Sequence, residues 1–312
     1  MESDLTNIEG ANQNLLQGLE LLQTSCMKCR NKPDYLGAIP YFKKAADIYH
    51  GCGKFDEEVS TREKLVRCFK NTKSYWEEGR EHEKNFKVQL NQLKNPVDAY
   101  NSSINSFHAY AMNKNYDNAI KSLSKASDEF LEHNDVEKAE DILKQAFEGI
   151  DKYYHILTFS NEDNHNYIYE CIDKYIDVLF SQEKYEDSIN ISKKTVEMIQ
   201  KEKADETKKI CRYYCFEAIA LLLLKNESEY NKVIDLGVQS EGSGNLCQKL
   251  DRLVNVVKQN DKENKNIIKS VYTDIAMETP NNVSKMLMNR YVKEATSEAE
   301  NNATTISEED MK

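Results

Sequence analysis

Hydrophobic and polar residues follow one another along this chain with the spacing of α-helices. Over residues 246–258, for example, Leu246, Leu250, Leu253, Val254 and Val257 fall on one face of a helix. Alternating runs of β-branched residues, which would indicate strands, are hard to find. The pattern therefore predicts an all-α protein.

A recurring unit organises the first part of the chain. It begins with an aromatic residue after a polar turn, continues with a small or short residue three positions later, and has a further aromatic a few turns on in its clearer copies. Four copies begin at Tyr35, Tyr116, Tyr185 and, in a shorter form, Tyr230. A small residue lets two antiparallel helices approach closely, while the aromatic fills the space beside the turn. The unit is typical of tetratricopeptide-like helical hairpins, which must stack to bury both faces.

The intervening segments predict the partner helices of these hairpins. A first helix is expected over residues 12–23, and the partner helices are expected over residues 55–69, 75–93, 97–112, 136–154, 167–180 and 207–224. The aromatic starts at Tyr35, Phe55 and Tyr75 are evenly spaced, whereas the later ones are not. We therefore expect a right-handed but degenerate array of antiparallel hairpins.

Three regions are predicted from the distribution of glycine, serine and charge. Glycine and serine residues between Gly237 and Gly244 indicate a loop. It separates a hairpin array over residues 1–236 from a C-terminal helical bundle over residues 245–293. Residues 294–312 are too polar to contribute to a core and are expected to form a flexible acidic tail.

Composition narrows the functional classes. The net charge of −11 argues against a nucleic-acid partner, because phosphate recognition needs an excess of lysine and arginine. The apolar run from Ala218 to Leu224 is far shorter than the roughly 20 residues that cross a bilayer, so it predicts a buried helix. The chain opens on acidic residues without an apolar signal segment, and its eight cysteines are then expected to be reduced. These features predict a cytoplasmic protein.

Motifs for catalysis or metal binding are scarce. Cys26 and Cys29 have C-x-x-C spacing, but a zinc site needs two further ligands at suitable spacing, and a redox site needs a βα context. Cys211 and Cys215 lie one helical turn apart and are expected in the core. Trp76 is expected to be a packing residue, and carboxylates on helix surfaces are expected to be solvated. We therefore expect no enzyme activity, no metal and no cofactor.

The segment of residues 24–34 is a candidate for membrane contact. It combines two apolar or soft side chains with three cations, namely Cys26, Met27, Lys28, Arg30 and Lys32. Apolar tips flanked by cations suit the surface of an anionic membrane. An ordinary solvated loop is the alternative interpretation. At the other end of the chain, residues 306–312 place an acidic cluster beside one apolar residue, which is a plausible docking peptide.

Several stretches resemble the soluble NSF attachment proteins, and particularly their gamma type. The residues concerned are Lys32 to Tyr35, Ala45 and Ala46, Gly53 to Phe55, and Tyr75 with Trp76. The terminus from Glu308 to Lys312 is similar to the acidic ending of the alpha type, with Met311 where that type carries leucine. The resemblance covers most of the chain in helix order. The segment of residues 24–34 matches the family's membrane-touching loop in position, without the phenylalanines of the alpha type.

The resemblance implies a function in vesicle transport and membrane fusion. Stacked hairpins capped by a C-terminal bundle would hold a SNARE four-helix bundle on a concave side, and the C-terminus would meet an NSF-type hexameric AAA ATPase. Glu308, Glu309 and Asp310 would face basic patches of the ATPase, and Met311 would take the place of the leucine. Peripheral membrane contact is implied as well. The alternative is a tetratricopeptide-type co-chaperone or scaffold that binds peptide termini, which would need a groove lined by lysine and asparagine.

Overall fold

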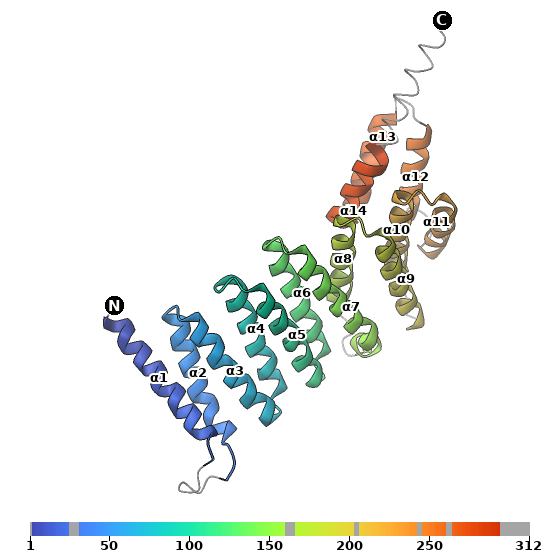
Figure 1. The fold of residues 1–312 in the computed structure, drawn as a ribbon. Coiled ribbons are helices and arrows are strands. Elements are labelled where there is room, and N and C mark those ends of the chain that lie inside the picture. The colour runs from blue at the N-terminus through green and yellow to red at the C-terminus, as the bar shows by residue number, and fades with distance from the viewer. Residues whose placement is uncertain are drawn as a thin grey trace, which may run out of the picture. The chain divides into compact units, whose positions relative to one another are not determined.

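The structure of the protein is a computed structural model that describes residues 2–24, 31–159, 166–202, 206–241, 245–259 and 264–293. Within these ranges the chain forms fourteen α-helices and a final π-helical segment, and it contains no β-strand (Figure 1). Consecutive helices pack against one another as antiparallel hairpins. The predicted all-α array of helical hairpins is confirmed.

The helices follow one another with short connections. In chain order they are α1 (Glu2–Leu22), α2 (Tyr35–Gly51), α3 (Phe55–Thr72), α4 (Tyr75–Asn91), α5 (Pro96–Met112), α6 (Tyr116–Glu132), α7 (Val136–Phe159), α8 (Asn166–Ser181), α9 (Tyr185–Lys201), α10 (Thr207–Leu223), α11 (Glu227–Glu241), α12 (Leu246–Gln259), α13 (Lys265–Ala276), α14 (Asn281–Met286) and the π-helical η2 (Leu287–Val292). The chain divides into two compact units, Met1–Tyr153 and Tyr154–Lys312, with the boundary inside α7.

The first unit is more regular than its aromatic residues suggest. From α2 to α7, successive helices start 20 or 21 residues apart, and α2, α4, α5 and α6 are each 17 residues long. Two of the starts, Pro96 and Val136, are not aromatic, so the aromatic pattern does not reveal them. The expected degenerate spacing is therefore wrong for this unit, in which α1 to α6 lie side by side (Figure 1).

The turns between these helices share one backbone design. Gly53, Lys73, Lys114 and Asn134 each follow a helix and adopt a left-handed conformation, with φ between 57° and 67°. The next amide then donates to a carbonyl five residues earlier, as from Asn115 N to Tyr110 O at 2.9 Å. This hydrogen bond is the Schellman ending of a helix, and it reverses the chain within a few residues. The connections are short enough to keep neighbouring helices antiparallel and in contact.

The core of the first unit depends on close approaches between neighbouring helices. Gly79 of α4 lies under the ring of Tyr110 of α5, where an added Cβ would be 2.9 Å from that ring. Ser106 Oγ donates to the carbonyl of Gly79 at 3.0 Å. The centroids of the Trp76 and Tyr110 rings are 5.1 Å apart. Trp76 is thus a packing residue, as predicted.

In the second unit, α10 is the central helix. It packs against α9, α11, α12, α14 and η2, and ten of its residues are buried. Residues 218–222 of the predicted apolar run are buried, whereas Leu224 is 40 % exposed beyond the helix end. The run therefore forms a buried helix, as expected.

The C-terminal helices pack back onto α8 and α10. The Asp177 carboxylate of α8 accepts hydrogen bonds from the backbone amides of Asn282 at 2.6 Å and Val283 at 3.4 Å, and thereby caps α14. Burial raises the pKa of Asp177, although these amides act in the opposite direction. The predicted separation of residues 1–236 from 245–293 stays a prediction.

Helix α11 continues into the glycine and serine residues, 237–244, that predict a loop; residues 242–244 lie outside the described ranges. It starts at Glu227, so that Tyr230 occupies its fourth position, and it continues through Gly237 to Glu241. A Cβ at Gly237 would lie 2.2 Å from Cys247 Sγ. The glycine therefore allows α12 to approach closely rather than ending the helix.

The left-handed turns predict opposite effects for one substitution at two positions. Lys114→Gly should stabilise the protein by about 0.5 to 1 kcal/mol, because glycine adopts positive φ without a steric penalty. Lys125→Gly, at an exposed position inside α6, should destabilise it by about 1 kcal/mol. Urea unfolding followed by Trp76 fluorescence measures both. Destabilisation by both substitutions would contradict the role of the turn.

Candidate functional site

The site residues predicted from the sequence lie mainly outside the described ranges. These are Glu308, Glu309, Asp310 and Met311 at the terminus, and Cys26, Met27, Lys28 and Arg30 in the first connection. Lys32 is described and exposed, just before Asp34, whose side chain accepts from the Gly37 amide at 2.8 Å and caps α2. Both predicted contact segments stay predictions. None of the helices in the described ranges has the length and apolarity needed to cross a bilayer.

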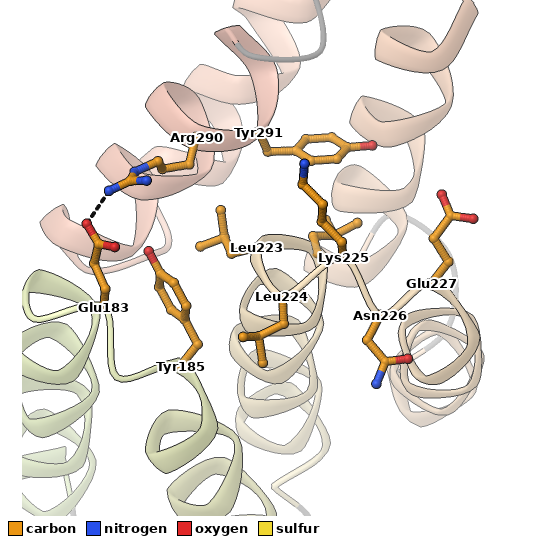
Figure 2. A pocket seen from close by; sticks show the side chains of 10 residues that line it. Glu183, Tyr185, Leu223, Leu224, Lys225, Asn226, Glu227, Arg290 and Tyr291 are labelled. Carbon is orange, nitrogen blue, oxygen red and sulfur yellow. Dashed lines mark hydrogen bonds and ion pairs between the residues drawn. The ribbon is translucent and has the colours of Figure 1, made fainter.

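A cleft of about 700 Å³ lies within the second unit, where the turns after α8 and α10 face η2 (Figure 2). Its volume is in the range of sites that hold small ligands or peptide ends. The lining residues are Glu183, Tyr185, Leu222, Leu223, Leu224, Lys225, Asn226, Glu227, Arg290 and Tyr291. Sequence reasoning missed this site, because its residues come from three separate parts of the chain.

Two ion pairs account for most of the charge around the cleft. The Arg290 guanidinium binds the Glu183 carboxylate (Figure 2). The Glu227 carboxylate lies 3.0 Å from the ammonium of Lys258 in α12. The Lys225 ammonium has no acceptor among the described residues. Burial and the Glu227 carboxylate raise the pKa of Tyr291 to about 12, so its hydroxyl is protonated at neutral pH. The cleft therefore offers one unpaired cation and a neutral donor beside an apolar wall.

The backbone explains how these side chains reach the cleft. Glu183 and Lys225 are both left-handed residues at helix ends, with φ of 59° and 58°. A residue in this conformation leaves the helical path, so its side chain projects from the turn. Arg290 and Tyr291 come from η2, which has the wider winding of a π-helix. Such segments are rare in proteins, and those that occur are often found at functional sites.

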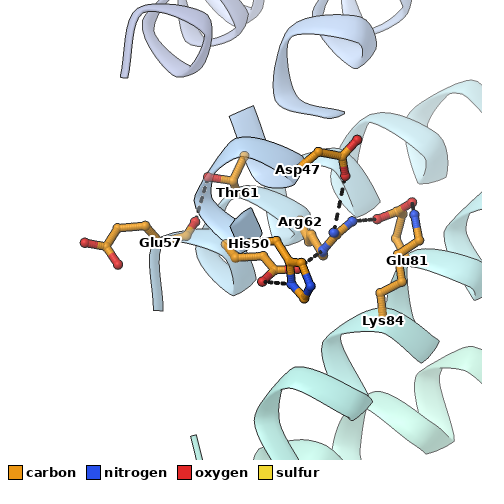
Figure 3. Close-up of polar contacts among 8 residues, drawn as sticks. Asp47, His50, Glu57, Thr61, Arg62, Glu81 and Lys84 are labelled. Atoms are coloured by element: carbon orange, nitrogen blue, oxygen red, sulfur yellow. Dashed lines mark hydrogen bonds and ion pairs between the residues drawn. The ribbon is translucent and has the colours of Figure 1, made fainter. Parts of the chain in front are cut away.

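A buried ionic cluster joins three helices of the first unit (Figure 3). Arg62 of α3 donates from Nε to Glu58 at 2.8 Å and from Nη1 to Glu81 of α4 at 2.6 Å. A longer bond of 3.5 Å connects it to Asp47 of α2. Glu58 is 1 % exposed and Glu81 is 4 % exposed. The general expectation of solvated carboxylates is wrong for this pair, and the i,i+4 spacing of Glu58 and Arg62 was the available signal.

The two buried carboxylates of this cluster keep the Arg62 guanidinium charged. Burial by itself would lower the pKa of Arg62, but the hydrogen bonds and charges of Glu58 and Glu81 raise it above its usual range. Lys84 donates to Glu81 at 2.6 Å, and His50 lies 2.9 Å from Glu58. The guanidinium is therefore the central cation between two buried carboxylates. Such a pair specifies which surfaces of α3 and α4 face each other.

A second polar cluster lies between α8 and α10. Asp173 and Arg212 pair at 2.7 Å, and the pKa of Asp173 is raised to about 6 by burial, against the opposing effect of Arg212. The hydroxyls of Tyr154 and Tyr169 are 2.8 Å apart nearby on α7 and α8. No group of three or more acidic, histidine or cysteine side chains within the described ranges is arranged to hold a metal ion. The Asp173–Arg212 pair connects α8 to α10, and the two tyrosine hydroxyls connect α7 to α8.

Removal of the central cation should be costly. Arg62→Met leaves two buried carboxylates without their cation, and we expect it to lower the free energy of unfolding by about 3 to 5 kcal/mol. Arg67→Met, at an exposed position of the same helix, should change it by less than about 0.5 kcal/mol. Urea unfolding followed by Trp76 fluorescence measures both variants. Equal effects would contradict the structural importance of the buried cluster.

Comparisons with known proteins do not assign this chain to a family. No protein-family model matches the sequence, and no curated protein matches it. Among solved structures, the chain is similar to BtubC (BKLC) from P. vanneervenii with a TM-score of 0.33 and 9 % sequence identity. That similarity covers 76 % of this chain and 90 % of the BtubC chain.

Proposed function

We propose that this chain is an adaptor without catalytic activity of its own. It would bind a SNARE four-helix bundle and recruit an NSF-type hexameric AAA ATPase, so that the bundle is taken apart during vesicle transport and membrane fusion. The observation that carries the proposal is the regular stack of antiparallel helices in the first unit. The resemblance of the N-terminal hairpins and of the acidic terminus to soluble NSF attachment proteins supports this choice of partners.

Stiffness is the physical property that such an adaptor needs. A body that passes force from an ATPase to a coiled coil must not bend at its internal contacts. In the first unit, short Schellman turns and close helix approaches limit sliding of neighbouring helices. The buried Arg62 cluster adds a polar connection across α2, α3 and α4. These contacts support a role in force transmission.

We assign the partner surface of the first unit to the exposed face of α5. Its outward residues between 101 and 112 are uncharged and lie one turn apart, namely Asn101, Asn105, His108 and Met112. The exposed faces of α3 and α7 carry mainly charged residues, including Glu57, Glu63, Arg67, Lys144 and Glu148. Uncharged residues lose less hydration on contact than charged ones. A partner helix therefore meets a lower desolvation cost on α5 than on α3 or α7.

The acidic terminus provides the first test. Substituting Glu308, Glu309 and Asp310 by Gln, Gln and Asn should leave folding and SNARE binding intact, and should abolish ATPase-dependent disassembly of the bundle. The reason is loss of the charges that would face basic ATPase patches. Control substitutions Glu298→Gln and Glu300→Gln remove charge from the same tail and should keep activity. Unchanged disassembly by the terminal variant would contradict the proposal.

The face of α5 provides the second test. Asn101→Glu together with Asn105→Glu should weaken SNARE-bundle binding by about tenfold or more, because unpaired carboxylates would be buried in the contact. Ser60→Glu together with Asn71→Glu adds the same charge to exposed positions of α3 and should have little effect. Binding is measured by titration of a fluorescent bundle. Equal affinities of both double variants would remove α5 from the partner surface.

A scaffold that binds peptide carboxyl termini is the second candidate function. The observation in its favour is the cleft of the second unit, where Lys225 and the Tyr291 hydroxyl lie beside Leu223 and Leu224. A carboxylate next to an apolar side chain would complement this set. Titration with one peptide in its free-acid and amidated forms separates the two functions, since only the scaffold requires a preference for the free acid.

A further inference from the structure

Two buried cysteines from different helices of the second unit contact each other. Cys211 lies in α10 and Cys247 is the second residue of α12. Their Sγ atoms are 3.7 Å apart, and Cys247 Sγ lies 3.3 Å from the carbonyl oxygen of Cys211. Both side chains are 0 % exposed. The expected burial of Cys211 is confirmed. Its contact with Cys247 could not be predicted from the sequence, because the two residues are 36 positions apart.

The helix packing around Cys247 leaves space for its thiol and for little else. Gly237 of α11 lies so close that an added Cβ would meet Cys247 Sγ at 2.2 Å. The Cys247 side chain is therefore enclosed between the glycine of α11 and the first turns of α10. Within this enclosure the Cys247 thiol donates to the Cys211 carbonyl, and the two sulfur atoms stay in contact.

Cys247 is the better placed of the two thiols to ionise. It lies in the first turn of α12, where Asn245 Oδ1 accepts the amide of Gln248 at 2.9 Å and caps the helix. The partial positive charge of a helix start favours a thiolate, which is the reactive form of cysteine. Cys211 lies at the second turn of α10, farther from such a start.

We propose that Cys211 and Cys247 are an oxidation site at which hydrogen peroxide converts two thiols into a disulfide between α10 and α12. The Cys247 thiolate attacks one oxygen of the peroxide and becomes a sulfenic acid; the hydroxide that leaves takes up the thiol proton and forms water. The sulfur of Cys211 then attacks the Cys247 sulfur, and the sulfenic hydroxyl leaves with the Cys211 proton as a second water. Two thiols are oxidised and one peroxide is reduced.

Geometry and burial set the conditions of this reaction. A disulfide bond is about 2.05 Å long, so the sulfur atoms must approach by roughly 1.7 Å from their contact distance. Peroxide reaches the enclosed thiols when the start of α12 opens locally. The same enclosure shields the finished disulfide from reductants. The crosslink then holds the C-terminal helices on α10, the central helix of the unit, whether or not the chain is a SNARE adaptor.

Peptide mapping of the full-length protein tests the site. The protein is treated with hydrogen peroxide, its remaining thiols are alkylated after denaturation, and the digest is read by mass spectrometry without reduction. We expect a linked pair of peptides containing Cys211 and Cys247, with the loss of two hydrogens. The oxidised protein should also unfold at a higher urea concentration than the reduced protein, because the crosslink restricts the unfolded chain.

Three variants separate the roles of the cysteines. Cys247→Ala should abolish both the linked peptides and the shift in the urea midpoint. Cys211→Ala should leave a sulfenic acid on Cys247 that dimedone traps, because the resolving thiol is missing. Cys215→Ala, one turn further along α10, is the matched control and should keep the link. Circular dichroism establishes that each variant is folded.

The peptide map of the unaltered protein decides the matter even where a variant fails to fold. Recovery of Cys211 and Cys247 as free thiols, at a peroxide concentration that oxidises the partly exposed Cys52, would overturn the proposal. A link from Cys247 to any cysteine other than Cys211 would overturn it as well.

Discussion

Most consecutive helices in the described ranges are joined by a few residues within which the chain reverses, and the rest of the structure depends on that reversal. A left-handed residue followed by a backbone hydrogen bond to the last turn achieves it after α2, α3, α5 and α6 in the first unit and after α8 and α10 in the second. The next helix then starts beside the previous one. Because these connections are short, each helix from α1 to α6 in the first unit contacts mainly its neighbours in the sequence. Packing of small residues against aromatic rings follows from this proximity.

A stack held only by neighbouring apolar contacts would leave sliding of one helix on the next weakly opposed. Buried polar contacts supply directional restraints at selected places. Arg62 donates to Glu58 and Glu81, and it can do so only in one arrangement of α3 and α4. Asp177 of α8 caps α14 through Asn282, which is 105 residues later in the sequence. Hydrogen bonds of this kind are lost if a helix shifts by one turn. They therefore define the register in each unit more sharply than apolar packing does.

The functional features are surfaces formed by several elements. The cleft of the second unit needs two helix-ending turns and the π-helical η2, and the thiol contact needs α10, α11 and α12 together. The uncharged face of α5 differs from its surroundings only because the exposed faces of α3 and α7 are charged. Features of this kind depend on residues that are far apart in the sequence. They also show why short motifs were uninformative for this chain.

The sequence by itself determined that the chain is helical, where most helices begin, and that Ala218 to Leu222 are buried. The periodicity of the sequence indicates these properties because apolar residues on the buried face of a helix recur with the helical repeat. Only the tertiary structure decided that α11 continues through Gly237, that Glu58 and Glu81 are buried with Arg62, and that Cys211 meets Cys247. In each of these cases the outcome depends on a neighbouring helix, which places a side chain or a charged group next to the residue. The spacing of residues within one helix does not identify the helix that packs against it. The partner of each buried face is therefore known only from the tertiary structure.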